Sequence, residues 1–195
     1  MMKNEMRNSY IISDTHFSHR NSWEKFKLPN GDPLRPFSST EEMDETMVER
    51  WNAVVKPQDY VYVLGDVSIN KKGLEHVKRL NGHKRLIMGN HDIHSNKMYY
   101  EAGFEKLAGV RVFVDKFVMS HIPLHPSCVS DRFVTNVHGH LHANYINSPE
   151  YLCVCVEHTN YAPISFEEVE ERIQMNRECF ESTGNVVNWG GGKAI

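Results

Sequence analysis

The chain has 195 residues, of which 40% are hydrophobic, and this is enough for one domain with a proper core. Its net charge is −3 with acidic and basic residues mixed, so it has no nucleic-acid-binding arm, and no run reaches the ~20 apolar residues that span a bilayer. Its four cysteines form no C-x-x-C pair, and Cys153 and Cys155, at i and i+2 of one apolar run, are expected to be reduced core thiols, which indicates a cytoplasmic protein.

Alternating strand and helix patterns run along the chain. Apolar, β-branched or aromatic runs predict strands at 10–12, 60–64, 86–88, 117–119 and 152–156, with a weaker run at 132–138. Helical spacing predicts helices that begin at capping boxes at 39–42 and 165–168, and shorter helices at 73–80 and 96–102. This mixture fits two packed sheets with helices outside.

Two segments stand apart from these elements. The polar, proline-rich segment 19–40 is a long loop, and loops of this length are usually functional or mobile, so we expect it to form one wall of a substrate site. A glycine-rich tail, 184–195, is expected to fray. The predicted domain therefore covers residues 1–183.

Five short blocks of metal-type ligands follow the predicted strands. They are Asp14-Thr15-His16, Gly65-Asp66, Gly89-Asn90-His91-Asp92, Ser120-His121 and Gly139-His140-Leu141-His142. Ligands at strand ends, in the crevice of an open α/β sheet, can converge although they lie far apart in sequence. Carboxylate, carboxamide and imidazole suit Zn, Mn, Fe or Co, and no thiolate belongs to any block. Seven candidate ligands exceed one four-coordinate ion, which favours two ions bridged by a shared carboxylate.

The spacing inside two of the blocks carries a further expectation. Asp14 and His16 stand at i and i+2, which places both side chains on one face of an extended segment. His140 and His142 repeat that spacing. On this basis each pair is expected to grip a single ion.

In their order, D-x-H, G-D, G-N-H-D, an isolated histidine and G-H-x-H resemble the calcineurin-like metallophosphoesterase superfamily, in its short stand-alone bacterial and phage form, over about residues 10–165. G-N-H-D is the most specific block. The resemblance implies an α+β fold, a four-layer α-β-β-α sandwich of two mixed sheets, with a dinuclear metal site at strand ends. It implies one ion held by Asp14, His16 and His142, a second held by Asn90, His121 and His140, and Asp66 as the bridge.

The same resemblance implies roles for the residues that follow Asn90. His91 would be the general acid that protonates the leaving oxygen, with Asp92 beside it as an orienting carboxylate. The implied cofactors are two divalent ions, with Mn favoured and Fe, Zn, Ni, Co or Mg as alternatives. Together they would activate a water as hydroxide, which attacks phosphorus in line.

Four further side chains are candidates for binding the substrate phosphate. His19 closely follows the first block, and His125 follows His121 by four residues. Arg20 and Arg35 are candidate clamps because a guanidinium group matches phosphate oxygens bidentately. Two solvated arginines in a long loop explain the same residues equally well.

The even charge balance and the lack of room for a capping domain favour a small phosphoester as the partner, a nucleotide-type phosphomonoester first of all. Neither a membrane nor stable nucleic-acid binding is expected. The alternative enzyme is a phosphodiesterase or nuclease that acts on cyclic nucleotides or short nucleic-acid ends. An alternative of another class is a scaffold protein that keeps the fold without turnover. His91, present together with every ligand, favours the enzyme.

Overall fold

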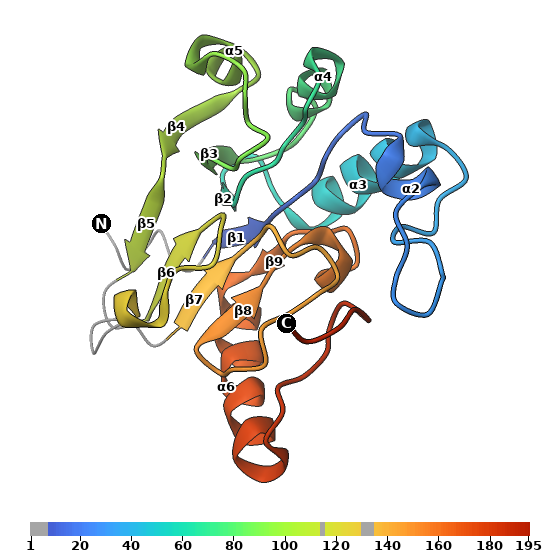
Figure 1. Cartoon of the computed structure of the whole chain (residues 1–195). Helices are drawn as coiled ribbons and strands as arrows, with labels where there is room; N and C mark the ends of the chain where they lie inside the picture. The colour runs from blue at the N-terminus through green and yellow to red at the C-terminus, as the bar shows by residue number, and fades with distance from the viewer. Residues whose placement is uncertain (1–7, 114–115, 130–134) are drawn as a thin grey trace.

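The computed structural model describes residues 8–113, 116–129 and 135–195, and the strands in these ranges form two sheets (Figure 1). The first sheet, in the order β4-β3-β2-β1-β9, contains β1 (Ser9–Ile12), β2 (Tyr60–Val63), β3 (His83–Ile87), β4 (Phe104–Ala108) and β9 (Ile164–Ser165). The second, in the order β5-β6-β7-β8, contains β5 (Val110–Phe113), β6 (Phe117–Ser120), β7 (Thr135–His138) and β8 (Tyr151–Cys153).

Each sheet is mixed. In the first, β1 to β4 run parallel and β9 is antiparallel to β1. In the second, β6, β7 and β8 run parallel and β5 is antiparallel to β6. The five ligand blocks all follow parallel strands, namely β1, β2, β3, β6 and β7. Because parallel strands end at the same edge of a sheet, each sheet presents its blocks along one edge.

Two longer helices begin where the capping boxes predict. These are α3 (Thr40–Val54) and α6 (Phe166–Thr183), and the shorter elements are α2 (Asn21–Glu24), α4 (Leu74–Val77), α5 (Asn96–Glu101), η1 (Lys71–Gly73), η2 (Pro126–Cys128) and η3 (Val156–His158). The Ser39 hydroxyl accepts a hydrogen bond from the Glu42 backbone N–H at 3.0 Å, and the Ser165 hydroxyl accepts one from Glu168 at 3.1 Å. These caps satisfy amides that the first helical turn leaves free.

One core lies between the first sheet and helices α3 to α5. Alternate residues of a strand face opposite sides of a sheet, so Val61 and Val63 point into this core while Tyr62 points the other way. From α3 the core receives three large buried side chains, Met43, Met47 and Trp51. The predicted apolar stripe of this helix is therefore core.

A second core lies between the two sheets. Ile11, Tyr62 and Leu64 of the first sheet face Phe117 and Val137 of the second. Helix α6 packs its apolar side, Phe166, Val169 and Ile173, into the same core. The predicted class, two mixed sheets with flanking helices, is confirmed.

The two sheets are also joined along the chain and by a bridge. The chain passes from β4 to β5 through Gly109, and so from the first sheet to the second. Beyond the ends of β1 and β8, Ser13 pairs with Cys155 in an isolated parallel bridge, and the Val156 backbone N–H donates to the Ser13 carbonyl oxygen at 3.1 Å. This bridge lies directly beside the first ligand block.

Some details differ from the sequence predictions. Strand β4 was not predicted because it pairs through one side only, and its sequence F-E-K-L-A carries exposed charges where a buried strand has apolar residues. Of the weaker run 132–138, residues 132–134 lie outside the described residues, and β7 begins at Thr135.

The expectation that the tail frays is wrong. Val186 is buried, the Gly192 N–H donates to the Ala143 carbonyl oxygen at 3.1 Å, and the Ile195 N–H donates to the Tyr145 carbonyl oxygen at 3.0 Å. A glycine at 192 allows this close approach, since an added Cβ would lie 2.3 Å from the Ala143 oxygen. The tail is therefore bound along residues 143–145.

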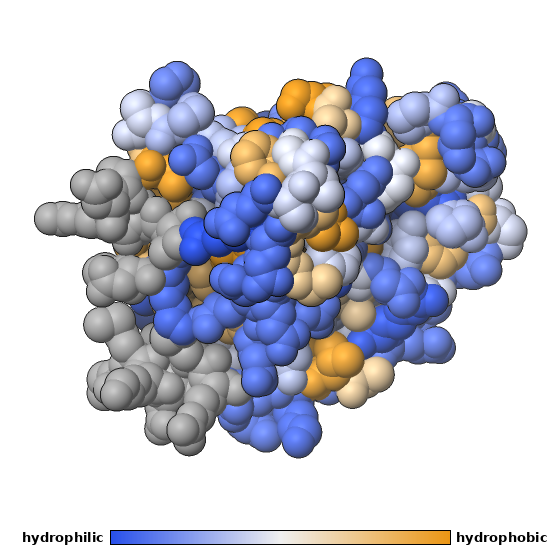
Figure 2. Space-filling model, turned by 90° about the horizontal axis from the view of Figure 1, so that it is seen from below, coloured by the Kyte–Doolittle hydropathy of each residue, from blue (hydrophilic) through white to orange (hydrophobic). Residues whose placement is uncertain are grey.

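Within the described part of the chain, no helix combines the length and the apolar character that a membrane crossing requires. The longest helix, α6, carries charged residues along its exposed side, among them Glu167, Glu170 and Glu171. The face in Figure 2 is mostly hydrophilic, and its apolar residues form small separate groups.

Phe166 links the parts of the second core, and its removal provides a test of the packing. It is 2% exposed, and its ring centroid lies 5.2 Å from those of Phe113 and Phe117 and 5.6 Å from that of Tyr62. Phe166→Ala should lower the free energy of unfolding by about 3–5 kcal/mol, measured in urea. The control Met175→Ala, at a 47% exposed position of the same helix, should change it by less than about 0.5 kcal/mol. Equal effects would contradict the packing.

Candidate metal centre

The Asp14 carboxylate is buried directly after β1, and its two oxygens have different surroundings. Oδ2 lies within hydrogen-bonding distance of three donors, the Ser13 hydroxyl at 2.6 Å, the His140 backbone N–H at 2.8 Å and the Cys155 thiol at 3.1 Å. Oδ1 has no hydrogen-bond partner among the described residues and lies 3.7 Å from His16 Nε2. One oxygen of the carboxylate is thus fixed by hydrogen bonds, and the other is available to bind a metal ion.

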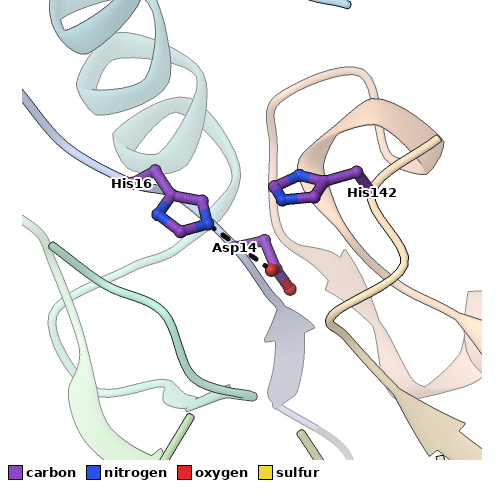
Figure 3. Close-up of side chains that lie close together, drawn as sticks. All are labelled: Asp14, His16 and His142. Carbon is purple, nitrogen blue, oxygen red and sulfur yellow. Dashed lines mark ion pairs between the residues drawn. The ribbon is translucent and has the colours of Figure 1, made fainter. Parts of the chain in front are cut away.

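Asp14, His16 and His142 form the first of two groups of metal-type donors (Figure 3). Their ligand atoms all lie within 4.8 Å of one another, and the two imidazole rings stand 5.2 Å apart, on either side of the carboxylate. His16 Nε2 is buried and, within the described chain, has no hydrogen-bond partner. A buried polar atom without a partner is costly, so this group fits a bound cation.

Asp66, His121 and His140 form the second group. His121 Nδ1 lies 2.7 Å from the Leu64 carbonyl oxygen, to which it donates, so in the neutral ring Nε2 carries the lone pair. That nitrogen faces two oxygens, Asn90 Oδ1 at 2.9 Å and Asp66 Oδ2 at 3.4 Å. Three acceptors that face one another require a cation or a proton between them. Asn90, predicted as a ligand, therefore adjoins this group.

The Asp66 carboxylate connects the two groups. Its Oδ2 lies 3.6 Å from His16 Nε2 in the first group and 3.4 Å from His121 Nε2 in the second. Its Oδ1 accepts a hydrogen bond from the His91 backbone N–H at 2.8 Å. One oxygen is therefore fixed by the backbone while the other faces both groups.

The electrostatics of the groups are those of a cation site. Burial by itself would raise the pKa of Asp14, but the imidazoles of His16, His142 and His121 hold it well below its usual range. Burial would lower the pKa of His121, yet the carboxylates of Asp66 and Asp14 raise it to about 9. Without a metal, a proton on His121 therefore supplies part of the missing positive charge. Two adjoining groups of oxygen and nitrogen donors fit divalent metal ions.

The backbone at most of these ligands is left-handed. Positive φ angles occur at Asp14 (58°), His16 (47°), Asp66 (53°), His140 (69°) and His142 (51°). Such a conformation costs a residue other than glycine roughly 1–2 kcal/mol. In the first, second and last blocks the side chains are therefore directed by turns of the backbone and not by an extended strand.

This geometry corrects the expectation drawn from the i, i+2 spacing. Asp14 and His16 do share a group, but His140 and His142 belong to different groups. The i, i+2 rule holds only for extended backbone, and all four residues have positive φ angles, so the spacing does not decide whether two residues share a group. His142 lies with Asp14 and His16, whereas His140 lies with Asp66 and His121.

Glu157 contacts the first group of candidate ligands, and the sequence analysis missed it. Its buried carboxylate lies 3.3 Å from His142 Nδ1, so that His142 donates there and turns Nε2 toward the first group. Burial would raise the pKa of Glu157, but the charges of Arg35 and His142 lower it to about 2. A signal existed, because Glu157 follows the apolar run 152–156 just as the ligand blocks follow their strands.

Arg35 has a different place from the one predicted for it. Its side chain is fully buried, and its guanidinium group donates to Glu157 at 2.8 Å and to the carbonyl oxygens of Asp14 at 2.6 Å and Thr15 at 2.9 Å. It binds the backbone of the first ligand block, and its burial contradicts both its prediction as a phosphate clamp and the alternative of a solvated arginine. Arg20 is exposed and forms an ion pair with Glu24 at 2.6 Å, so its predicted role stays a prediction.

The two candidate histidines outside the ligand blocks lie in different surroundings. The His19 ring lies 5.5 Å from the His16 ring, at the edge of the first group. Burial, followed by the nearby charges of His16 and Arg35, lowers the pKa of His19 to about 4, so it is neutral at pH 7. His125 is exposed and caps η2, where its Nδ1 accepts from the Ser127 backbone N–H at 3.2 Å. Their contact with substrate remains a prediction.

His91 and Asp92 are neighbours in the sequence but have different surroundings, because His91 is exposed and Asp92 is buried. The exposed His91 ring lies 5.8 Å from the His16 ring and belongs to neither group of ligands. The buried Asp92 carboxylate instead accepts backbone N–H groups of Gly89 at 2.8 Å, Asp66 at 2.9 Å and Val67 at 3.0 Å. Asp92 thus ties the second and third ligand blocks together, where the sequence analysis expected it to orient His91.

The structure thus defines an α+β protein of two mixed sheets, with two adjoining groups of metal-type donors at the strand ends. No family model matches the chain. The chain is 34% identical over 184 residues to the uncharacterized protein MJ1445 of Methanocaldococcus jannaschii, a match that covers 88% of this chain and 94% of that protein. It therefore belongs to the same family as MJ1445.

The fold also has solved counterparts. A protein of unknown function, AQ665 from Aquifex aeolicus, superposes with a TM-score of 0.64 at 26% identity and covers 84% of this chain and 97% of its own. Weaker likenesses are the Pseudomonas putida nuclease MPE (TM-score 0.46, 15% identity, 73% of this chain and 64% of that one) and an archaeal phosphodiesterase (0.43, 20%, 75% and 81%). These two are too distant to support an argument about function.

Gly139 offers a test of how Asp14 is positioned. A Cβ at residue 139 would lie 2.0 Å from Ser13 Oγ and 2.4 Å from Asp14 Oδ2. Gly139→Ala should therefore displace the carboxylate and reduce the bound metal, measured by elemental analysis of protein equilibrated with Mn²⁺. Gly109→Ala is the control, because nothing lies within 4 Å of its Cβ. Full metal content in the Gly139→Ala protein would show that the close approach does not position Asp14.

Proposed function

We propose that the protein is a metallophosphoesterase of the calcineurin-like superfamily that hydrolyses a small phosphoester, with nucleotide-type phosphomonoesters first among the candidates. The observation that carries the proposal is the position of Asp66 Oδ2, which faces both His16 Nε2 and His121 Nε2. One carboxylate shared by two groups of ligands is the arrangement of two-metal phosphoryl chemistry.

In the proposed centre, Asp14, His16 and His142 would hold one ion, Asn90, His121 and His140 would hold the other, and Asp66 would contribute to both. Two divalent ions, with Mn²⁺ as the first candidate, would supply the positive charge that neutralises phosphoryl oxygens and lowers the pKa of a water toward neutrality. Arg35 and Glu157 keep the first ligands oriented, and Asp92 keeps the second and third blocks together.

His91 is proposed as the general acid. Its ring is exposed beside the first group while its backbone N–H is bound to Asp66 Oδ1, so the imidazole is anchored near the centre without being a ligand. It would donate its proton to the oxygen that leaves phosphorus, which spares that oxygen from departing as a free alkoxide.

Two other functions make different predictions. A phosphodiesterase or nuclease on cyclic nucleotides or short nucleic-acid ends would share the centre and prefer diesters. A scaffold protein would bind metals without turnover. Hydrolysis of p-nitrophenyl phosphate and bis(p-nitrophenyl) phosphate by the Mn²⁺-loaded protein separates the three, since the phosphomonoesterase favours the first, the diesterase the second, and the scaffold neither.

Metal stoichiometry tests the shared carboxylate. The protein should bind two Mn²⁺ per chain, measured by elemental analysis and calorimetry. Asp66→Asn removes the charge that faces both groups, so it should weaken both binding steps, whereas His121→Asn should weaken one. A single ion in the wild-type protein at saturating Mn²⁺ would exclude the two-metal centre.

His91→Asn separates an acid from a ligand. The variant should keep both metals and yet lose roughly 10²–10⁴-fold in kcat on a nucleotide, whose leaving oxygen is basic. On p-nitrophenyl phosphate the loss should be clearly smaller, because p-nitrophenolate leaves well without a proton. Equal losses on both substrates would contradict the acid role, and loss of a metal would make His91 a ligand.

A further inference from the structure

A pocket of about 480 Å³ opens beside the two metal-ligand histidines of the last block. Its lining comprises residues 25–29, Leu34 and residues 140–144, and so includes both His140 and His142. Pockets for small ligands measure about 300–1,000 Å³, so this one can take a group the size of a nucleoside. A phosphoester bound at the metal centre would have this pocket next to it.

The wall opposite the histidines is a loop with fixed geometry. It lies between α2 and α3, in the segment that projects to the right in Figure 1. The Leu34 N–H donates to the Phe26 carbonyl oxygen and the Leu28 N–H to the Asp32 carbonyl oxygen, both at 2.8 Å. An antiparallel bridge between Lys27 and Pro33 closes the loop. The pocket is therefore preformed on both sides.

The apolar part of the lining offers an aromatic ring. Phe26 is 43% exposed, although large aromatic side chains are usually buried, and its ring lies 6.0 Å from the His19 ring. Leu28, Leu34 and Leu141 add apolar surface around it. An exposed aromatic ring at the mouth of a pocket is a stacking surface for a planar heterocycle.

The loop side of the lining contributes two lysines. Lys25 and Lys27 are exposed lining residues, and the lining contains no Asp or Glu. The nearest carboxylates in sequence are engaged elsewhere, since Glu24 pairs with Arg20 and Asp32 accepts from Asn30 at 2.7 Å. Two lysines without a carboxylate among them favour an anionic group, of which phosphate is the strongest candidate.

We propose that this pocket binds a nucleotide unit of the substrate, with the base on Phe26 and with a phosphate other than the scissile one between Lys25 and Lys27. The inference rests on the proposed function and narrows it. The substrate carries at least two phosphates, one at the metal centre and one at the lysines. This class includes short nucleic-acid ends, dinucleotides and nucleoside bisphosphates.

Equilibrium binding tests the proposal independently of turnover. The probes are thymidine 3′,5′-bisphosphate, thymidine 5′-monophosphate and inorganic phosphate, titrated calorimetrically into the full chain with Mn²⁺ and with chelator. The bisphosphate should bind about tenfold more tightly than the monophosphate or better. Lys25→Gln/Lys27→Gln should abolish that difference. Phe26→Ala should weaken both nucleotides by roughly 5- to 100-fold and leave inorganic phosphate unchanged.

Matched controls exclude general effects of charge and surface. Lys97→Gln/Lys106→Gln removes the same charge from α5 and β4, and Tyr100→Ala removes a 52% exposed aromatic ring from α5. None of these residues lines the pocket, so the control proteins should bind all three probes like the wild type. An equal loss of bisphosphate affinity in the control and the pocket variants would overturn the proposal.

The outcomes also separate this inference from the proposed function. If the protein hydrolyses p-nitrophenyl phosphate while the pocket variants bind the bisphosphate like the wild type, the inference fails and the function stands. If no metal supports turnover while bisphosphate affinity depends on Phe26, Lys25 and Lys27, the nucleotide site stands and the function fails.

Discussion

The hydrogen bonding of one carboxylate oxygen, Asp14 Oδ2, is the constraint on which the centre depends. Asp14 and Ser13 follow β1 of the first sheet, whereas His140 and Cys155 follow β7 and β8 of the second. Their donors meet at this oxygen only when the two sheets are packed in register, which the Ser13–Cys155 bridge maintains. Because donors from both sheets fix one carboxylate oxygen, the geometry of the candidate metal centre depends on the packing of the two sheets.

The same region holds features that oppose folding in the absence of a cation. His16 Nε2 is buried without a hydrogen-bond partner in the described chain, and five candidate ligand residues have left-handed backbone. Each feature costs free energy that packing elsewhere must offset. Phe166 and its aromatic neighbours, and the apolar side of α3, supply such packing. Binding of a cation to the native state then adds stability by mass action, because the unfolded chain has no preformed site.

Much of the fold and the convergence of the two donor groups could be predicted from the sequence, because an apolar run followed by Asp or His indicates both the end of a strand and a possible metal ligand. What could not be predicted depends on contacts between loops of different sheets. Arg35 stands in a polar loop, where an arginine is usually exposed. It is buried because its guanidinium group binds Glu157 and the carbonyl oxygens of Asp14 and Thr15, which only the fold brings together. The sequence suggests that Asp92 orients its neighbour His91, whereas its carboxylate accepts hydrogen bonds from the backbone of Asp66 and Val67 in the loop after β2. The spacing of His140 and His142 misled because a positive φ angle leaves no mark in a spacing pattern.

The positive φ angles at the ligand positions create a conflict between the stability of the fold and the retention of the ligand side chains. At Asp14, His16, His140 and His142 the best residue for the backbone would be glycine or asparagine, which tolerate positive φ at lower cost. Selection for thermal stability alone would therefore favour replacements that destroy the site, while selection for metal binding opposes them. A library of variants screened in chelator for heat resistance alone should enrich variants that have lost the ability to bind metal. Directed evolution of this protein must therefore select for stability and for metal binding together.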